Sequence, residues 1–326
     1  MAFTTINYGI VGAGHIGNFH TQQIQNIKNK VKLIGIYDID FNHAQEVALK
    51  NKTCAFKSLK ELLAQCDAVS IATPANSHTE ITIEALNANC HVFIEKPLAT
   101  TIDECKKIIN VSDNLNLMVQ VGHIERFNPA FLAFKNKQSE IPLFLESQRL
   151  TPFTNRGIDT NVILDLMIHD IDLVLSLVKS KVETIHANGI NILTDSLDLV
   201  NARIEFENGS VANLVASRIS DSPMRKLRIF SQKNYTSLDL QNHKLTTYRI
   251  EDAPNEKIQS SAFSLGNKFI LLEKEQIPKN NALYEELLAF ITSIQTSSEV
   301  KVTKLDGLRA IETAIMIQNQ IHEQKK

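Results

Sequence analysis

The chain has 326 residues, and at about 100–200 residues per domain this length predicts two domains. An apolar fraction of 43% and a charged fraction of 21% are typical of a globular protein, which excludes a disordered or low-complexity chain. The 34 Lys and Arg residues are balanced by 36 Asp and Glu residues, so the formal net charge is −2. Because nucleic-acid binders carry an excess of positive charge, we expect no nucleic-acid partner.

The apolar runs and the cysteines indicate a cytoplasmic protein. No uncharged apolar run approaches the roughly 18 residues that span a bilayer, so we expect no membrane partner. Residues 1–8 lack the positive region and cleavage site of a signal peptide. The four cysteines are Cys54, Cys66, Cys90 and Cys105. Their spacings match no zinc-binding or redox motif, and we expect free thiols and no metal.

Short apolar runs alternate with helical patterns through about residue 125. Strands are predicted at residues 8–12, 31–38, 68–72, 91–95 and 117–121. Helices are predicted at residues 17–28, 42–50, 78–87 and 101–112. Continuous Val and Ile runs are typical of strands buried on both faces, and strand–helix alternation favours right-handed crossovers. Residues 1–122 are therefore predicted to form an α/β domain with a doubly wound parallel sheet.

Residues 123–326 follow a different pattern, in which Asn128-Pro129 is typical of a helix start. Strands are predicted from residue 143 onward, including 202–206, 210–217, 227–230 and 237–240. Asn208-Gly209 between the first two of these strands indicates a hairpin. Helices are predicted at residues 162–179, 283–294 and 304–323, and an exposed loop at residues 251–261. We expect an α+β domain on a mostly antiparallel open sheet, whose C-terminal helices can pack back on the first domain.

A glycine-rich segment separates the first predicted strand from the first predicted helix. Residues 12–17 (GAGHIG) fit the pattern G-x-G-x-x-G in the context that dinucleotide binding requires. Gly12 makes the tight turn, Gly14 lets the backbone approach a pyrophosphate, and Gly17 allows close packing of helix and strand. The phosphates would lie at the positive end of the helix dipole. The segment predicts a Rossmann dinucleotide-binding domain, and the alternative is a glycine-rich turn that binds nothing.

Asp38 ends the second predicted strand, 21 positions after Gly17. An acidic side chain at this place accepts hydrogen bonds from the adenosine ribose hydroxyls and repels a 2′-phosphate. The next residues, Ile39 and Asp40, supply no Arg for such a phosphate. We therefore expect NAD rather than NADP, unless Asp38 only ends the strand, because Asp is common in turns.

Two polar motifs follow predicted parallel strands. Residues 73–78 (TPANSH) follow one strand, and Glu95-Lys96-Pro97 follows another. Because open α/β sheets bind ligands at the carboxyl ends of their strands, Lys96 is expected at the cofactor crevice. The alternative is an exposed loop lysine, since most Lys side chains are solvated.

Together these motifs resemble the Gfo/Idh/MocA family, which is named after glucose–fructose oxidoreductase, inositol dehydrogenase and a rhizopine-catabolism protein. The resemblance spans nearly the whole chain and rests on residues 12–17, 73–78, 95–97, 165–170 (DLMIHD) and 306–310 (DGLRA). It implies NAD(P)-dependent oxidoreduction of a sugar, cyclitol or related hydroxyl. It also implies that Lys96 lies beside the nicotinamide and that His169 lies near the reacting hydroxyl.

Three segments are similar to the branch of this family that acts on nucleotide sugars, in particular to UDP-N-acetylglucosamine 3-dehydrogenases: residues 121–130, 149–157 and 165–172. The residues expected to bind the cofactor are Gly12, Gly14, His15, Ile16, Gly17, Asp38, Thr73, Pro74, Asn76, His78, Glu95 and Lys96. The residues expected to bind the substrate are Lys96, His123, Arg126, Arg149, Arg156, Asp159, Asp165 and His169.

The predicted helix at residues 162–179 is apolar on most sides yet carries Asp165 and His169. Residues four apart share one helix face, and a nearby carboxylate can orient an imidazole. A buried ionisable pair needs partners or a function, although an ordinary core His with a carboxylate partner is the alternative. Arg149 and Arg156 flank the helix and suit a diphosphate, or they are simply solvated arginines.

The sequence thus predicts an NAD-dependent oxidoreductase that acts on a nucleotide-activated amino sugar, with the 3-hydroxyl of UDP-N-acetylglucosamine as the leading candidate. Either Lys96 or His169 takes the proton, and Asp165 orients His169. The alternatives are a dehydrogenase of a free sugar or inositol, and a dinucleotide-binding sensor without turnover. The family resemblance implies a homodimer or homotetramer formed through the open sheet.

Overall fold

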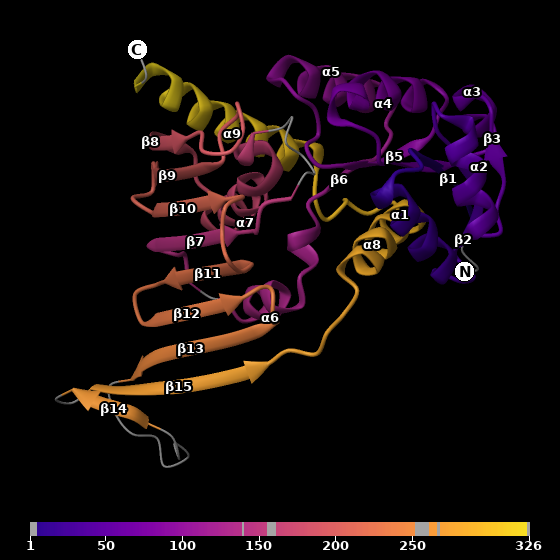
Figure 1. Cartoon of the computed structure of the whole chain (residues 1–326). Coiled ribbons are helices and arrows are strands. Elements are labelled where there is room, and N and C mark those ends of the chain that lie inside the picture. The colour runs from indigo at the N-terminus through magenta and orange to yellow at the C-terminus, as the bar shows by residue number, and fades with distance from the viewer. Residues whose placement is uncertain (1–4, 139, 155–160, 252–260, 266–267, 325–326) are drawn as a thin grey trace. The chain divides into compact units, whose positions relative to one another are not determined.

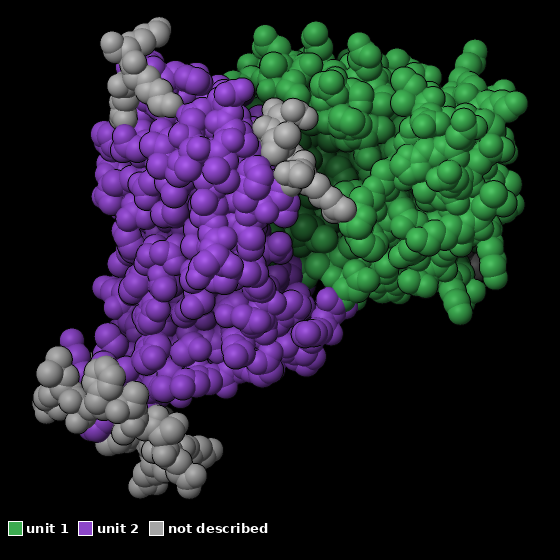
Figure 2. All heavy atoms as spheres, in the orientation of Figure 1, with its two compact units in different colours: residues 1–127, 281–311 green, residues 128–280, 312–326 purple. Residues whose placement is uncertain are grey.

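The computed structural model describes residues 5–138, 140–154, 161–251, 261–265 and 268–324. The chain divides into two compact units, which Figure 2 shows in separate colours. The first unit contains residues 1–127 and 281–311, and the second contains residues 128–280 and 312–326. Residues 123–127 and 281–311, which the sequence analysis assigns to the second domain, therefore cluster with the first unit. Among the described residues, no helix is long and apolar enough to cross a bilayer.

The first unit is built on a six-stranded sheet in the order β3-β2-β1-β4-β5-β6 (Figure 1). Its strands are β1 (Ile6–Val11), β2 (Val31–Tyr37), β3 (Ala55–Phe56), β4 (Ala68–Ile71), β5 (His91–Glu95) and β6 (Val119–Gly122). All neighbouring strands are parallel, which confirms the doubly wound sheet. The strand order reverses between β1 and β4, and open sheets bind ligands at such a switch point.

Helices connect these strands as the alternating pattern predicts. They are α1 (His15–Asn26), α2 (Phe41–Lys50), α3 (Leu59–Leu63), α4 (His78–Asn87) and α5 (Ile102–Asn114), with 3₁₀ turns η1 (Ala75–Ser77) and η2 (Ile124–Phe127). Thr101 and Glu104 form a capping box at the start of α5, and Asp40 caps α2. These caps satisfy N–H groups that a helix cannot pair internally, so each helix begins where its cap lies.

The core of the first unit includes a helix from far along the chain. α8 (Ala282–Thr296) contributes Leu287, Phe290 and Ile291, which are fully buried among residues of β1 and β5. The Phe290 ring meets Tyr8 and Phe93 edge to face, with ring centroids 6.5 and 5.9 Å apart. Such contacts add to the free energy gained by burying the rings.

The second unit is built on a nine-stranded sheet in the order β14-β15-β13-β12-β11-β7-β10-β9-β8 (Figure 1). Its strands are β7 (Phe144–Leu150), β8 (Val182–Ile190), β9 (Leu199–Phe206), β10 (Val211–Ser217), β11 (Met224–Phe230), β12 (Asn234–Asp239), β13 (Lys244–Glu251), β14 (Ser261–Leu265) and β15 (Lys268–Gln276). β7 and β10 are parallel, and every other neighbouring pair is antiparallel. The predicted hairpin is confirmed between β9 and β10, where Gly209 has a φ of +82°.

Helices cover one face of this second sheet. They are α6 (Pro129–Lys137), a π-helical turn η3 (Ile163–Met167), α7 (Ile168–Val178) and α9 (Lys304–Gln324), whose residues are divided between the two units. In β7, β9 and β10, buried side chains alternate with half-buried or exposed ones, apart from the buried end of β10. This period of two is typical of an antiparallel sheet with one covered face, which confirms the predicted open sheet.

Candidate functional site

The glycine turn between β1 and α1 has two glycines that the protein's own packing requires. Gly12 has a φ of +100°, and a Cβ there would lie 2.6 Å from the carbonyl oxygen of Ala72. A Cβ on Gly17 would lie 1.8 Å from the carbonyl oxygen of Gly12, so only glycine lets α1 approach the turn this closely. Both positions therefore have the role that the motif predicts.

Gly14 differs, because a Cβ there would meet no atom within 4 Å. Its missing side chain leaves open space at the start of α1, where no side chain caps the helix and the first turn has no acidic residue. His15 and Ile16 are exposed beside it. Uncapped N–H groups at a helix N-terminus bind anions, so this turn fits the pyrophosphate of a dinucleotide. When bound, such a cofactor exchanges a hydride at its nicotinamide.

Asp38 lies next to this turn, directly after β2. Its Oδ2 accepts a hydrogen bond from the Ala13 N–H at 2.6 Å, and its Oδ1 accepts one from the Asp40 N–H at 2.9 Å. These two bonds fix the carboxylate beside the glycine turn while the side chain stays half-buried. Each carboxylate oxygen has a second lone pair, so Asp38 can still accept from ribose hydroxyls.

The loops after β4 and β5 are held together by His78. Its Nδ1 lies 2.8 Å from the carbonyl oxygen of Pro97, and its Nε2 lies 2.9 Å from that of Thr73. The ring is buried, and burial lowers the pKa of His78 although both carbonyls favour the protonated form. Because both ring nitrogens contact backbone carbonyls, His78 shapes the two loops, and its contact with the cofactor stays a prediction. Pro74 and Asn76 are exposed and Thr73 is half-buried, so these three remain open to a ligand.

Glu95 is the last residue of β5 and Lys96 follows it, and the two side chains have different surroundings. Glu95 Oε1 lies 2.8 Å from Nε2 of His20, a fully buried residue of α1. Burial would raise the pKa of Glu95, but His20 and Lys96 outweigh this effect and lower it. Glu95 is therefore held by His20 and the Lys96 N–H, and a cofactor contact of this carboxylate stays a prediction. Lys96 is half-buried at the carboxyl end of the sheet, where the sequence predicts it.

His123 and Arg126, which follow β6, have side chains that are largely buried within the first unit. His123 is 1% exposed, and the Arg126 guanidinium lies 3.5 Å from a carboxylate oxygen of Asp306 at the start of α9. Burial would raise the pKa of Asp306, but Arg126 and Thr303 lower it. The Arg126 side chain is only 9% exposed, so the expected phosphate contact competes with an ion pair inside the first unit.

In the second unit, the segment with Asp165 and His169 is not one continuous α-helix. Residues 163–167 form a π-helical turn, and α7 begins at Ile168. Asn161 starts this segment by accepting hydrogen bonds from the N–H groups of Ile163 and Leu164. Asp165 thus precedes the junction and His169 follows it, and both are half-buried. The spacing of four residues predicts a shared face only for a regular α-helix, whereas π turns are frequent at functional sites.

Arg149, which the sequence predicts as a ligand of the substrate diphosphate, is buried and paired with an acidic side chain. Its side chain is 3% exposed, and its Nε and Nη2 donate to Asp170 of α7 at 2.7 and 3.3 Å. The Ser147 hydroxyl donates to the same carboxylate at 2.7 Å. This bidentate pair joins β7 to α7, so Arg149 acts as a structural residue rather than as an open phosphate ligand. Arg156 and Asp159, also expected to bind substrate, lie outside the described residues.

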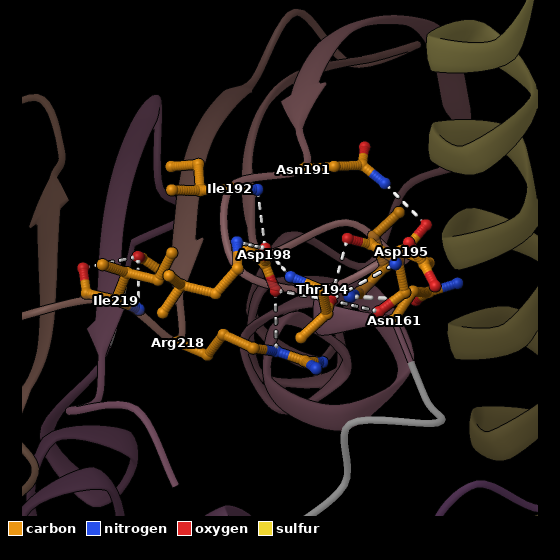
Figure 3. A network of polar contacts seen from close by, with 12 residues as sticks. Asn161, Asn191, Ile192, Thr194, Asp195, Asp198, Arg218 and Ile219 are labelled. Carbon is orange, nitrogen blue, oxygen red and sulfur yellow. Dashed lines mark hydrogen bonds and ion pairs between the residues drawn. The ribbon is translucent and has the colours of Figure 1, made fainter. Parts of the chain in front are cut away.

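A second network lies at the edge of the sheet where β7 and β10 end (Figure 3). Asp198 is fully buried, and its Oδ2 accepts hydrogen bonds from the N–H groups of residues 192–194 at 2.7–3.0 Å. Its Oδ1 accepts from the Thr194 hydroxyl and lies 3.9 Å from Nε of Arg218. Burial would raise the pKa of Asp198, but these donors lower it to about 2. The network fixes the loop that precedes β9.

Among the described residues, no group of three or more His, Cys, Asp or Glu side chains is arranged to hold a metal ion. Comparisons with known proteins match two family models to the chain. An oxidoreductase family model with an NAD-binding Rossmann fold matches residues 6–123, and the GFO/IDH/MocA C-terminal domain matches residues 122–235.

One relative matches over nearly the whole chain, and another matches over about half of it. A UDP-N-acetylglucosamine 3-dehydrogenase of Acidithiobacillus ferrooxidans is 34% identical over 309 residues, which is 95% of each chain. The chain belongs to the Gfo/Idh/MocA family of oxidoreductases. A solved structure of UDP-N-acetylglucosamine 3-dehydrogenase GnnA from the same organism has a TM-score of 0.89 and covers 98% of this chain and 99% of its own. An inositol 2-dehydrogenase of Salmonella typhimurium is 31% identical over 191 residues, 56% of this chain and 57% of its own.

The structure of this Gfo/Idh/MocA oxidoreductase also shows polar contacts that the sequence analysis missed. His20 contacts both Ser70 and Glu95, and Asp198 with Arg218 orders the loop that precedes β9. The signal for His20 was available, because a histidine at a buried position of α1, three residues after Gly17, needs a partner. No local pattern indicates Asp198, since its donors are backbone groups of a loop.

Proposed function

We propose that this protein is an NAD-dependent dehydrogenase that oxidises the 3-hydroxyl of UDP-N-acetylglucosamine. The observation that carries the proposal is the likeness to a UDP-N-acetylglucosamine 3-dehydrogenase, which extends over 95% of both chains and so includes both units. The open glycine turn and the fixed Asp38 carboxylate support the dinucleotide. The charge of Asp38 supports NAD over NADP, because it would repel a 2′-phosphate.

Oxidation of an alcohol needs a base as well as a hydride acceptor. The hydroxyl loses its proton as the carbon loses hydride, and the proton must pass to a positioned side chain. Lys96, at the carboxyl end of β5, and His169, at the start of α7, are the two groups suited to hold this proton. Asp165 precedes His169 in the adjoining π turn, and we propose that its carboxylate supports the imidazolium that would form if His169 takes the proton.

The diphosphate of the substrate needs cationic donors, and Arg149 is already paired. Arg225 lies directly opposite Arg149 in the β7–β11 register, so both side chains lie on the same face of the sheet. Arg225 is exposed, so its guanidinium is accessible to a ligand. On its exposure and its place in the register, we assign Arg225 a contact with the diphosphate. An Arg225→Ala variant should raise KM for the nucleotide sugar by about tenfold, which corresponds to about 1.4 kcal/mol.

The substrate proposal is tested by the rate of NADH formation with three compounds. UDP-N-acetylglucosamine should be turned over, whereas free N-acetylglucosamine and myo-inositol should react at least about a hundredfold more slowly at equal concentration. The free sugars lack the remote phosphate contacts that fix the reacting ring. Equal or faster turnover of inositol would instead favour the second candidate, an inositol dehydrogenase, which the partial likeness to inositol 2-dehydrogenases supports.

The third possibility is a dinucleotide sensor without turnover. A sensor needs the glycine turn and Asp38 but does not need both Lys96 and His169. Binding of NADH with no turnover of any of the three compounds would favour the sensor. The ¹³C NMR spectrum of the oxidised product separates oxidation at C3 from oxidation at another carbon.

A further inference from the structure

Four side chains form a continuous row of hydrogen bonds beneath the carboxyl ends of the parallel strands. The hydroxyl oxygens of Tyr8 and Ser70 lie 2.8 Å apart, and Ser70 Oγ lies 3.0 Å from Nδ1 of His20. His20 Nε2 then lies 2.8 Å from Oε1 of Glu95. The row joins β1, β4, α1 and β5 within the first unit. Tyr8, Ser70 and His20 are each 0% exposed, so the first two bonds are made away from water, and the Glu95 side chain at the end of the row is 19% exposed.

One arrangement of protons satisfies the whole row. An ionised Glu95 can only accept, so Nε2 of His20 carries a proton and donates it. Nδ1 of a neutral ring then accepts from the Ser70 hydroxyl, and Ser70 Oγ accepts from Tyr8. Burial raises the pKa of the Tyr8 phenol, which keeps its hydroxyl protonated. The row therefore consists of fixed dipoles that all point toward Glu95.

The Glu95 carboxylate is confined on its other sides as well. Its second oxygen, Oε2, accepts from the Lys96 N–H at 3.3 Å. A Cβ on Gly122 of the neighbouring strand β6 would lie 3.1 Å from this carboxylate, so Gly122 leaves just enough room for it. The Phe93 ring meets the His20 ring edge to face at 5.3 Å and shields the contact from water. Hydrogen bonds in such apolar surroundings are stronger than in water.

We propose that His20 is a positioning residue for Lys96, which it reaches through the Glu95 carboxylate. This inference rests on the proposed dehydrogenase function, in which Lys96 meets the substrate. His20 fixes Glu95, Glu95 holds the Lys96 N–H, and His78 holds the Pro97 carbonyl on the other side of Lys96. The two buried imidazoles of His20 and His78 thus hold the backbone of residues 95–97, which fixes the position of the Lys96 Cα.

Two substitutions of His20 separate positioning from simple packing. In His20→Gln, the amide nitrogen falls near the former Nε2 and can still donate to Glu95. In His20→Asn, the shorter amide reaches Ser70 but leaves Glu95 without its donor. Each variant loses one of the two hydrogen bonds, so both should lose similar thermal stability. A structural role alone predicts equal effects on turnover, whereas the positioning role predicts different ones.

We expect His20→Asn to lower kcat for the nucleotide sugar about 10–100-fold and His20→Gln to stay within about threefold of the wild type. The Kd for NADH should change less than about threefold in both, because the glycine turn and Asp38 are untouched. His91→Gln is the matched control. His91 lies at the opposite end of β5, where its Nδ1 accepts from the Met118 N–H. Its loss should lower Tm without changing kcat.

A second measurement does not depend on turnover. Trinitrobenzenesulfonate modifies lysine amines, and peptide mass spectrometry measures its rate of reaction with Lys96 in the substrate-free protein. This rate reports the surroundings of the Lys96 amine. This rate should change at least about threefold in His20→Asn and remain unchanged in His20→Gln and His91→Gln. Gly122→Ala, which crowds the carboxylate without removing any polar group, should change it in the same direction as His20→Asn.

Equal kcat values and equal labelling rates in the Asn and Gln variants would overturn the positioning role. If the wild type turns over no nucleotide sugar, the proposed function fails, yet the labelling comparison still decides whether His20 acts on Lys96. A loss of NADH binding in His20→Asn as large as its loss of kcat would also contradict the inference, because it would indicate a general collapse of the cofactor domain.

Discussion

At the scale of single residues, we expect the position of one carboxylate, that of Asp38, to set the preference between NAD and NADP. Backbone N–H groups hold Asp38 beside the glycine turn, so its charge cannot swing away from a 2′-phosphate. We expect the wild type to bind NADH at least about tenfold more tightly than NADPH, a difference of about 1.4 kcal/mol. Asp38→Ser should narrow this ratio, because the hydroxyl carries no charge. Fluorescence titration measures both affinities.

The control for Asp38 is Asp40, which caps α2 through the N–H groups of Asn42 and His43. Asp40→Ser keeps a capping oxygen and should leave the NADH-to-NADPH ratio unchanged. A wild type that prefers NADPH would show that Asp38 does not face the ribose.

Asp198 predicts an acid-sensitive stability. Its folded pKa of about 2 lies below its ordinary value of 3.8, so the folded state binds the proton more weakly. The stabilisation is therefore complete above pH 4 and is lost as the pH falls toward 2. Asp198→Asn should cost about 1–3 kcal/mol at pH 7, because it removes a charged acceptor from buried donors. Urea unfolding at pH 7 and pH 3 should show a smaller difference from the wild type at pH 3, and a constant difference would contradict this account.

At the scale of elements, the glycine turn offers a pair of alanine variants with opposite expectations. Gly17→Ala places a Cβ 1.8 Å from a backbone oxygen and should prevent normal folding of the first unit. Gly14 has a φ of −59°, and its Cβ would meet open space, so Gly14→Ala should fold with an unchanged Tm. We expect Gly14→Ala to weaken NADH binding about tenfold, because the methyl group occupies the space proposed for the pyrophosphate. Unchanged NADH affinity would place the cofactor elsewhere.

The uncovered face of the second sheet carries a row of aromatic side chains. Phe144, Phe230, Tyr235 and Tyr248 follow one another across β7, β11, β12 and β13, with centroids 4.7–5.7 Å apart. We propose that this row joins two copies of the chain, as the family resemblance implies. Tyr235→Arg should then give a monomer in size-exclusion chromatography with light scattering, whereas Tyr248→Phe should keep the wild-type oligomer. A monomeric wild type at micromolar concentration would contradict the proposal.

Most elements of the first unit could be predicted because each has a local signal. α4 and β5 begin and end where the pattern places them, since a Pro or a polar motif bounds each. β3 and α3 were missed, because two and five residues are too short to show a period. β8 was missed because it lies at the edge of its sheet, with exposed polar side chains between few buried ones. The π turn before α7 has no sequence signature separate from an apolar helix.

At the scale of the whole molecule, site residues could be predicted only where they belong to a short sequence motif. Gly12, Gly17 and Lys96 lie where the motifs place them. Arg149 was assigned to the substrate because a lone Arg near a site suggests phosphate, and its partner Asp170 lies on a helix 21 residues away. His20 and its partner Glu95 likewise lie 75 residues apart in the sequence. Such pairings depend on tertiary packing, which a single sequence does not reveal.

The proposed dehydrogenase activity requires that Lys96 acts on the substrate. The most direct measurement is the initial rate of NADH formation from NAD and UDP-N-acetylglucosamine by the wild type and by Lys96→Met, a variant of similar length without charge. We predict turnover by the wild type and a kcat lowered about 10²–10⁴-fold in the variant, the usual range for a general acid–base group. NADH formation by Lys96→Met at the wild-type rate, or none by the wild type, would contradict the claim.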